Sequence, residues 1–368
     1  MSKRPDRLNP DPLADQERID GAIYGMGLGD SWGFPTEFMR HKGIIFMAPP
    51  PPHPLQITDD TQMSLYNSKA LENIFERELD LDEILTDVGQ QTRVRKLFAE
   101  EHLKFEVDPD NNRAPGLTVM SALWVYRRSA RATGLEGSSP NDSKGCGTIM
   151  RSPWFGLLPL DRNRIAALAI LQSETTHGHA QASLSAAVAA IFLKGIFEGK
   201  ISLGRDSAIN RLRSVLLYAT SIASNIGRMD SNLVLSEDFQ DEIAELRDLI
   251  YNSLVSIEAL SEKELMDPDA DICKWFGQGW VAEEALLCAL AAFALYGNDA
   301  YGGIRRLVYS NGDSDSIAAI GGSFFGAYVG IEELEAQARS NGVRLRGSFE
   351  ARYNAELEDA SNFFGGLI

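Results

Sequence analysis

The sequence predicts a mostly α-helical protein, on three observations. Long segments place apolar residues at the three- and four-residue spacing of one helix face, for example residues 62–75 and 281–297. Alternating patterns typical of β-strands are few and short, and no internal repeat is found. Because no linker rich in glycine, serine or charge divides residues 19–335, we expect one helical domain.

The first elements follow from local patterns. Residues 1–18 are polar, with three prolines and several charges, and are expected to form an extended arm, either disordered or ordered by a partner. The small-residue segment 19–33 predicts a helix that packs closely against its neighbours. Four consecutive prolines at 49–52 exclude a helix there. A second helix is expected after Thr58.

The rest of the chain continues this helical pattern. Further helices are expected at residues 81–100, 116–130, 164–176, 180–199 and 281–297, and over much of 207–262. The tail at 336–368 is more polar, but it keeps helical spacing from residue 348 and is expected to pack on the core. The helical domain is therefore predicted over residues 19–368.

Composition narrows the class of protein. With 35 basic and 52 acidic residues, the formal net charge is -17, which argues against a nucleic-acid or anionic-membrane binder and suits binding of cations. The apolar run at 285–296 is too short to span a bilayer, and the N-terminus lacks the apolar core of a secretory signal. Three widely spaced cysteines indicate neither a disulfide framework nor a zinc site. We expect a soluble, cytoplasmic protein.

Two segments place carboxylates and a hydroxyl at a predicted helix start. They are TDDT at 58–61 and GDSDS at 312–316. Taken singly, each is explained by an ordinary cap, with a Thr58 or Ser314 hydroxyl accepting from an orphan N–H group and acids in the first turn. Taken together, they supply oxygen ligands of the kind that Mg²⁺ and Mn²⁺ prefer. If the two helix starts meet, a two-metal site is the expected arrangement.

Other segments carry weaker signals. Glu37 follows the first helix in irregular backbone, although an isolated acid is more often an exposed surface residue. The glycines around Cys146 suit a phosphate contact or a plain turn. His177 and His179, two residues apart at a predicted helix start, do not share a helix face, so a paired zinc site is not expected. Trp280 suits stacking on a base or sugar, or core packing.

These motifs occur together, and in the same order, in the ADP-ribosylglycohydrolase family, which the chain resembles over about residues 19–335. The resemblance rests on GMGLGDSWGFPTE at 25–37, TDDT, GCGTIMR at 145–151, TTHGHA at 175–180, GQGWVAEEAL at 277–286 and GDSDS. It implies an orthogonal bundle of many helices around one cleft, with two Mg²⁺ or Mn²⁺ ions at its base.

The resemblance also implies roles for individual residues. The implied metal ligands are Thr58, Asp59, Asp60, Asp313, Asp315 and Ser316. The implied substrate-facing residues are Gly145, Gly147, His177, Gly277, Gly279 and Trp280. Glu37 matches the acid that follows the first helix in the family. Cys146 departs from the family, which commonly has asparagine there. Around residues 108–118 the family has a glycine-rich segment preceded by polar residues, from which Asp108 and Asp110 could reach the cleft.

Two functions from different classes follow. The first is hydrolysis of the N-glycosidic bond between ADP-ribose and a modified protein side chain, with arginine favoured. Asp60 or Asp315 would orient or deprotonate the attacking water, and Glu37 is a rival base. The second is an immunity protein, which binds and blocks a cognate ADP-ribosyltransferase toxin through residues 1–18, with or without hydrolysis.

Overall fold

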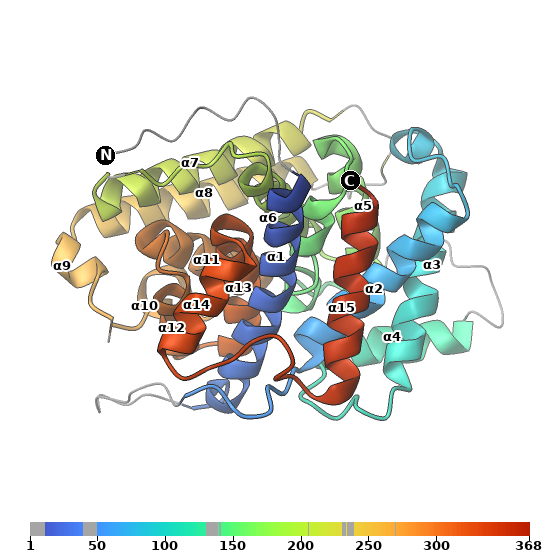
Figure 1. Ribbon diagram of the computed structural model, residues 1–368. Coiled ribbons are helices and arrows are strands. Elements are labelled where there is room, and N and C mark those ends of the chain that lie inside the picture. Colours follow the sequence, from blue (N-terminus) through green and yellow to red (C-terminus); the bar gives the residue numbers. More distant parts are fainter. Residues whose placement is uncertain are drawn as a thin grey trace.

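The computed structural model describes residues 12–39, 50–129, 139, 141–204, 206–229, 233, 239–268 and 270–368, and within them it is helical throughout (Figure 1). The α-helices are α1 (Pro12–Gly33), α2 (Asp59–Glu76), α3 (Val88–Glu106), α4 (Leu117–Ser129), α5 (Arg162–Ser173), α6 (Ala180–Phe197), α7 (Ala208–Ile226), α8 (Phe239–Glu258), α9 (Glu262–Leu265), α10 (Cys273–Phe276), α11 (Ala282–Tyr296), α12 (Ala300–Val308), α13 (Ser314–Val329), α14 (Ile331–Ser340) and α15 (Ala351–Gly366). β-structure in these ranges is limited to two isolated bridges, Leu55 with Phe349 and Gly145 with Val281. The all-α prediction is confirmed.

The first helix begins earlier than the sequence pattern indicates. Helix α1 starts at Pro12, seven residues before the predicted boundary at Ile19, so residues 12–18 belong to the helical domain. Arg18 donates to the carbonyl of Ile196, at 3.0 Å, and Gln16 donates to the Ser361 hydroxyl at 2.8 Å. Residues 1–11, the rest of the predicted arm, lie outside the described residues.

Helices α1 and α13 run antiparallel at very close range, because both carry small residues at four-residue intervals. A Cβ atom added to Gly25 would lie 2.2 Å from the carbonyl oxygen of Gly322, and one added to Gly29 would lie 2.0 Å from that of Ala318. Any larger side chain at these positions would push the helices apart. This contact places the end of α1 beside the start of α13.

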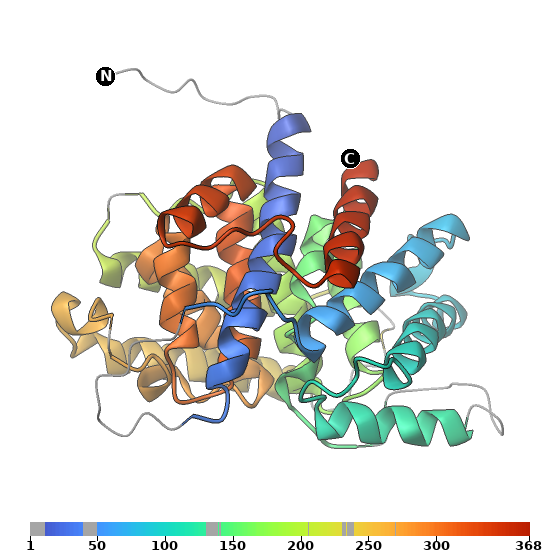
Figure 2. The same cartoon turned by 60° about the horizontal axis from the view of Figure 1, so that its bottom comes forward.

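Helix α1 lies at the centre of the molecule (Figures 1 and 2). In both views α11 to α14 lie on one side of it and α15 with α2 on the other. The C-terminal tail therefore packs on the core as predicted, through α15 against α1 and α2.

One further core helix has an unusual composition. Among the described helices, α6 is the only single helix that is long and apolar enough to cross a membrane. However, 89% of its 18 residues are buried inside the protein. Helices α13 and α14 pass the same test only as a pair bent by 114°. Burial against neighbouring helices accounts for the apolar composition of α6.

Candidate active site

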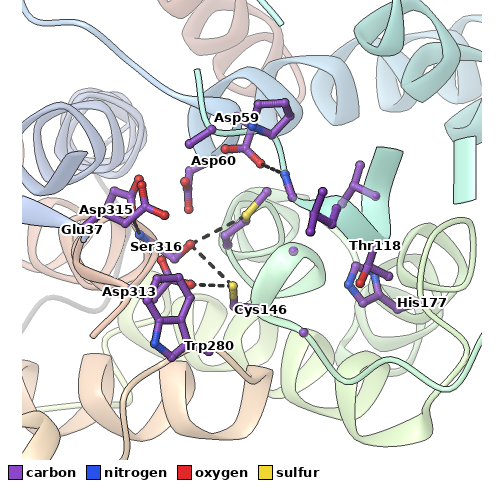
Figure 3. A pocket seen from close by; sticks show the side chains of 18 of the residues that line it. Glu37, Asp59, Asp60, Thr118, Cys146, His177, Trp280, Asp313, Asp315 and Ser316 are labelled. Atoms are coloured by element: carbon purple, nitrogen blue, oxygen red, sulfur yellow. Dashed lines mark hydrogen bonds between the residues drawn. The ribbon is translucent and has the colours of Figure 1, made fainter. Parts of the chain in front are cut away.

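A cavity of about 520 Å³ opens where the starts of α2, α4 and α13 meet the loop that follows α1. Ten of the predicted site residues line it: Glu37, Asp59, Asp60, Gly145, Gly147, His177, Trp280, Asp313, Asp315 and Ser316. Figure 3 shows the carboxylates gathered on one side of this cavity, with Thr118 and His177 on the other. The two helix starts, more than 250 residues apart in the chain, therefore share one site.

Five buried carboxylates form what we call the acid cluster: Asp30, Glu37, Asp60, Asp313 and Asp315. Ligand oxygens of Asp30, Asp60 and Asp315 lie within 4.8 Å of one another, and so do those of Glu37, Asp313 and Asp315. Both sets contain Asp315. Two three-carboxylate sets that share one residue match the donor pattern of a site for two divalent cations.

Thr58 occupies the N-cap position of α2 with Asp59 and Asp60 in the first turn, as the cap interpretation predicts, but its side chain accepts from none of the orphan N–H groups. Its hydroxyl lies 2.7 Å from Asp30 Oδ1 and 3.0 Å from Asp60 Oδ2 instead. Asp313 precedes α13 and likewise makes no side-chain cap bond. The Ser314 hydroxyl donates to the carbonyl of Gly33 at 2.9 Å. Both hydroxyls therefore bond to residues of α1, and they connect that helix to the starts of α2 and α13.

Asp30 is the member of the acid cluster that sequence reasoning missed. It accepts hydrogen bonds from the backbone N–H groups of Thr58 and Thr61 as well as from the Thr58 hydroxyl. It lies in the last turns of α1, where helical spacing makes it look like one polar residue among small ones. Only the close contact between α1 and α13 brings it to the cavity.

Asp59 is a predicted metal ligand that lies outside both three-carboxylate sets. Its side chain lines the cavity, and its Oδ2 accepts from the N–H group of Gly116 at 3.2 Å. Thr58, also a predicted ligand, is fully buried behind the cavity wall. The structure thus brings Asp60, Asp313 and Asp315 together in the two sets, with Ser316 beside them in the lining.

The acid cluster is buried without a positive charge among the described residues that line the cavity. Burial, together with the negative charges nearby, raises the pKa values of Asp60 and Asp315 well above the usual range. Burial and the charge of Asp313 raise the pKa of Glu37 to about 8. Asp60 Oδ1 and Glu37 Oε2 are buried without a hydrogen-bond partner among the described residues. Free buried oxygens beside like charges fit hard divalent cations, which would satisfy both deficits.

Cys146 occupies the position where the resemblance places asparagine, and it contacts the acid cluster. Its Sγ donates to Asp313 Oδ2 at 2.8 Å and lies 3.7 Å from the Ser316 hydroxyl (Figure 3). Burial and the charge of Asp313 raise the pKa of this thiol, so it stays protonated. The other cysteines, Cys273 and Cys288, are also free thiols.

The loop at 277–281 is fixed by backbone hydrogen bonds on both sides. Cys146 N donates to the Trp280 carbonyl at 3.1 Å, and Asp313 N donates to the Gln278 carbonyl at 2.8 Å. Gly277 and Gly279 are not among the cavity-lining residues, and with φ values of 90° and 80° they shape the turn that presents Trp280. The Trp280 ring stacks on Phe38 at the cavity, with ring centroids 5.9 Å apart.

His177 forms part of the wall opposite the acid cluster. It is 1% exposed, its Nδ1 lies 2.9 Å from the Thr176 hydroxyl, and its ring lies against Gly145 and Gly147. Burial lowers the pKa of His177 to about 3, so the ring is neutral at physiological pH. His179 does not join it, because its Nδ1 accepts from Gln181 N as the cap of α6.

Sequence reasoning also missed the wall formed by residues 114–119. Ala114, with a φ of 54°, turns the chain so that residues 114–119 line the cavity. The preceding acids do not reach it, because Asp108 and Asp110 bind Arg352 of α15. Residues 114–116 form an irregular turn before α4, and such a turn carries no periodic pattern that would reveal its path.

Comparisons with known proteins bear on the family and the fold of this chain. The model of the family described as ADP-ribosylglycohydrolase matches residues 11–360. The chain is 26% identical over 336 residues to the uncharacterized protein YegU of Escherichia coli (strain K12), covering 87% of this chain and 90% of that protein. It also has the fold of a solved structure titled ADP-ribosylglycohydrolase-related protein complex, with a TM-score of 0.62 and 20% identity over 96% of this chain and 99% of that one.

Proposed function

Since the chain belongs to the ADP-ribosylglycohydrolase family, we propose that it is a metal-dependent hydrolase that removes ADP-ribose from modified protein side chains, with arginine as the preferred acceptor. The observation that carries this proposal is the acid cluster, whose two three-carboxylate sets share Asp315 beside a cavity. The reducing cytoplasm is the proposed compartment, in keeping with three free thiols.

The donor set fits Mg²⁺ or Mn²⁺, because every ligand atom in the two sets is a carboxylate oxygen. Asp30, Asp60 and Asp315 would hold one ion, and Glu37, Asp313 and Asp315 the other, with Ser316 at hand in the cavity lining. Bound divalent cations would supply neutralisation of the carboxylates and oxygen coordination for ribose hydroxyls.

The chain's own residues then account for the rest of the reaction. The cavity wall with His177 and the glycines on either side of Cys146 would hold the ADP part. A water oxygen forms a bond to ribose C1″ while the bond from C1″ to the side-chain nitrogen breaks; one proton of the water passes to a carboxylate and from there to the leaving nitrogen. Glu37 and Asp60 each have a buried oxygen without a hydrogen-bond partner among the described residues, and they are assigned to accept the proton of that water.

The test is release of free ADP-ribose by the purified full chain from arginine-ADP-ribosylated protein, with Mg²⁺ or Mn²⁺ and with EDTA. Serine-ADP-ribosylated protein serves as the parallel substrate. We expect metal-dependent release that is faster from arginine. Absence of release from both substrates with either metal would overturn the hydrolase proposal, and faster release from serine would overturn the arginine preference.

A further inference from the structure

Two buried threonine–histidine pairs involve the adjacent residues Thr175 and Thr176, and His177 of the second pair lines the cavity. The Thr175 hydroxyl lies 2.9 Å from Nδ1 of His102, and the Thr176 hydroxyl lies 2.9 Å from Nδ1 of His177. All four side chains are at most 2% exposed. Because a neutral imidazole has one donor and one acceptor nitrogen, the direction of each hydroxyl bond fixes what the other ring nitrogen does.

For His177 the direction is set by Arg151. The Nη2 group of this buried arginine lies 2.7 Å from the Thr176 hydroxyl oxygen, and a guanidinium nitrogen can only donate. Burial lowers the pKa of Arg151 to about 9, which still leaves it charged at neutral pH. The Thr176 oxygen is therefore an acceptor from Arg151.

The proton of the Thr176 hydroxyl then has two acceptors within reach. One is Nδ1 of His177, at 2.9 Å, and the other is the carbonyl of Ser173, at 3.5 Å. The shorter contact is the stronger hydrogen bond, since 3.5 Å lies beyond the normal range. In the alternative, an N–H group at Nδ1 of His177 would donate to the Thr176 oxygen, and its partial positive charge would lie close to the charge of Arg151. Nδ1 of His177 is thus the acceptor, and its Nε2 carries the proton.

The two histidines differ in the group that lies beside Nε2. Nε2 of His102 is 2.8 Å from Asn67 Oδ1, whose amide nitrogen donates to the carbonyl of Arg151. Among the described residues Nε2 of His177 has no such acceptor; it lies beside Gly145, 3.3 Å from where a Cβ would stand, in the wall that faces the acid cluster across the cavity (Figure 3). A ring donor that faces the cavity and has no acceptor among the described residues is suited to a ligand oxygen.

We propose that Arg151 and Thr176 are positioning residues that hold His177 as a neutral Nε2–H donor toward an acceptor oxygen of ADP-ribose. This inference rests on the proposed function for the identity of the ligand. It assigns His177 to binding and excludes it as a general base, because its cavity-facing nitrogen already carries a proton.

The tautomer can be read directly by NMR of the full chain labelled with ¹⁵N-histidine, without substrate or turnover. The protein has five histidines, and the His177→Ala variant identifies the two ring signals that belong to His177. We expect Nδ1 to show the shift of a bare ring nitrogen and Nε2 that of a protonated one. The reverse assignment would overturn the proposal, whatever the outcome of the hydrolase assay.

The role of the Thr176 hydroxyl between Arg151 and His177 is tested by a matched pair of variants, Thr176→Val and Thr175→Val. ADP-ribose binding is measured by calorimetry. Each removes one buried hydroxyl from one histidine. We expect Thr176→Val to change the His177 ring signals and to weaken ADP-ribose binding at least about 5-fold, the loss expected for one ordinary hydrogen bond. Thr175→Val should leave both unchanged.

Two outcomes would contradict this expectation. An unchanged His177 tautomer and ADP-ribose affinity in a folded Thr176→Val protein would overturn the role of the Thr176 hydroxyl. An equal loss of ADP-ribose affinity in Thr175→Val would show that the loss in Thr176→Val is only a structural effect. Thr176→Ser keeps the hydroxyl, and it should retain the wild-type tautomer and affinity. If Thr176→Val does not fold, loss of either property in Thr176→Ser would overturn the proposal.

Discussion

Two groups of acids in this molecule meet opposite electrostatic conditions. In the acid cluster, the carboxylates face one another, and burial with mutual repulsion raises their pKa values. At the other group, which we call the α15 clamp, cations lie among the acids; it consists of Asp108, Asp110, Arg113, Glu350 and Arg352. Hydrogen bonds from Arg352 lower the pKa of Asp108 below its usual range.

The difference distinguishes a structural ion-pair network from a site that needs a ligand. In the clamp, Arg352 Nη1 donates to Asp108 at 2.7 Å, and Tyr66 donates to the same carboxylate at 2.5 Å, so the charge is satisfied within the protein. The acid cluster has no such cation among the described residues that line the cavity. Acids buried without a partner are costly to keep, and a bound cation would offset that cost.

The largest expected effect comes from removing a shared ligand. Asp315→Asn should reduce ADP-ribose release at least about 100-fold, because both three-carboxylate sets lose their common member. The same variant should be more stable than wild type in EDTA, since one repelling charge is gone. Steady-state assays and urea unfolding measure the two effects.

The matched control for this variant is Asp59→Asn, which changes an acid on the cavity wall outside both sets. It should lose less activity than Asp315→Asn. Equal turnover in Asp315→Asn and wild type would contradict the assignment of the acid cluster as the metal centre.

The clamp should show an effect of intermediate size on stability and none on metal affinity. Arg352→Ala leaves Asp108, 4% exposed, without its cation, and should lower the free energy of unfolding by about 1–3 kcal/mol, because Arg352 itself is one-third exposed. Urea unfolding measures the loss. Lys96→Ala, which breaks an exposed pair with Glu100, should change it by less than about 0.5 kcal/mol.

If the clamp contributed to metal binding, the two groups of acids would not differ in function as described above. Calorimetry with Mn²⁺ should therefore give the same affinity for Arg352→Ala as for wild type. A large loss of Mn²⁺ affinity in that variant would mean that the clamp acts on the metal centre.

The last comparison concerns the pH dependence of stability, in which the two groups of acids should have opposite signs. In EDTA, the pKa of Glu37 is raised from 4.5 to about 8 in the folded chain. The unfolded state therefore releases this proton first, and the contribution of Glu37 to stability, full below pH 4.5, is lost as pH rises toward 8. Unfolding in EDTA at several pH values measures this loss, which Glu37→Gln should remove.

Asp108 has the opposite sign. Its pKa is lowered in the folded chain, so its contribution is present above the ordinary aspartate pKa and is lost on acidification. Asp108→Asn should therefore flatten the acid side of the stability curve and leave the neutral side unchanged. The same slope near neutral pH in wild type and Glu37→Gln would contradict the assignment to Glu37.

Local patterns predicted the helices and the two acidic helix starts, because both are written in contiguous residues. TDDT and GDSDS name Asp60, Asp313 and Asp315, and the structure places all three in the acid cluster. The start of α1 was misplaced, because the polar residues after Pro12 hide the contacts that Arg18 makes with the end of α6.

What the sequence left undetermined depends on tertiary contacts. Asp30 reaches the site only because α1 and α13 pack glycine against backbone. The Thr58 hydroxyl donates toward the carboxyl groups of Asp30 and Asp60 and accepts from no orphan N–H group, and a local motif cannot reveal that orientation. The placement of Cys146 against Asp313 likewise joins residues 167 positions apart.

The most direct test of the central claim is a calorimetric titration of the metal-free full chain with Mn²⁺. If the acid cluster is a two-cation centre, wild type should bind two ions per chain, and Asp315→Asn should lose both high-affinity sites. Absence of Mn²⁺ binding by the folded wild-type protein, or the same two sites in Asp315→Asn, would contradict the account.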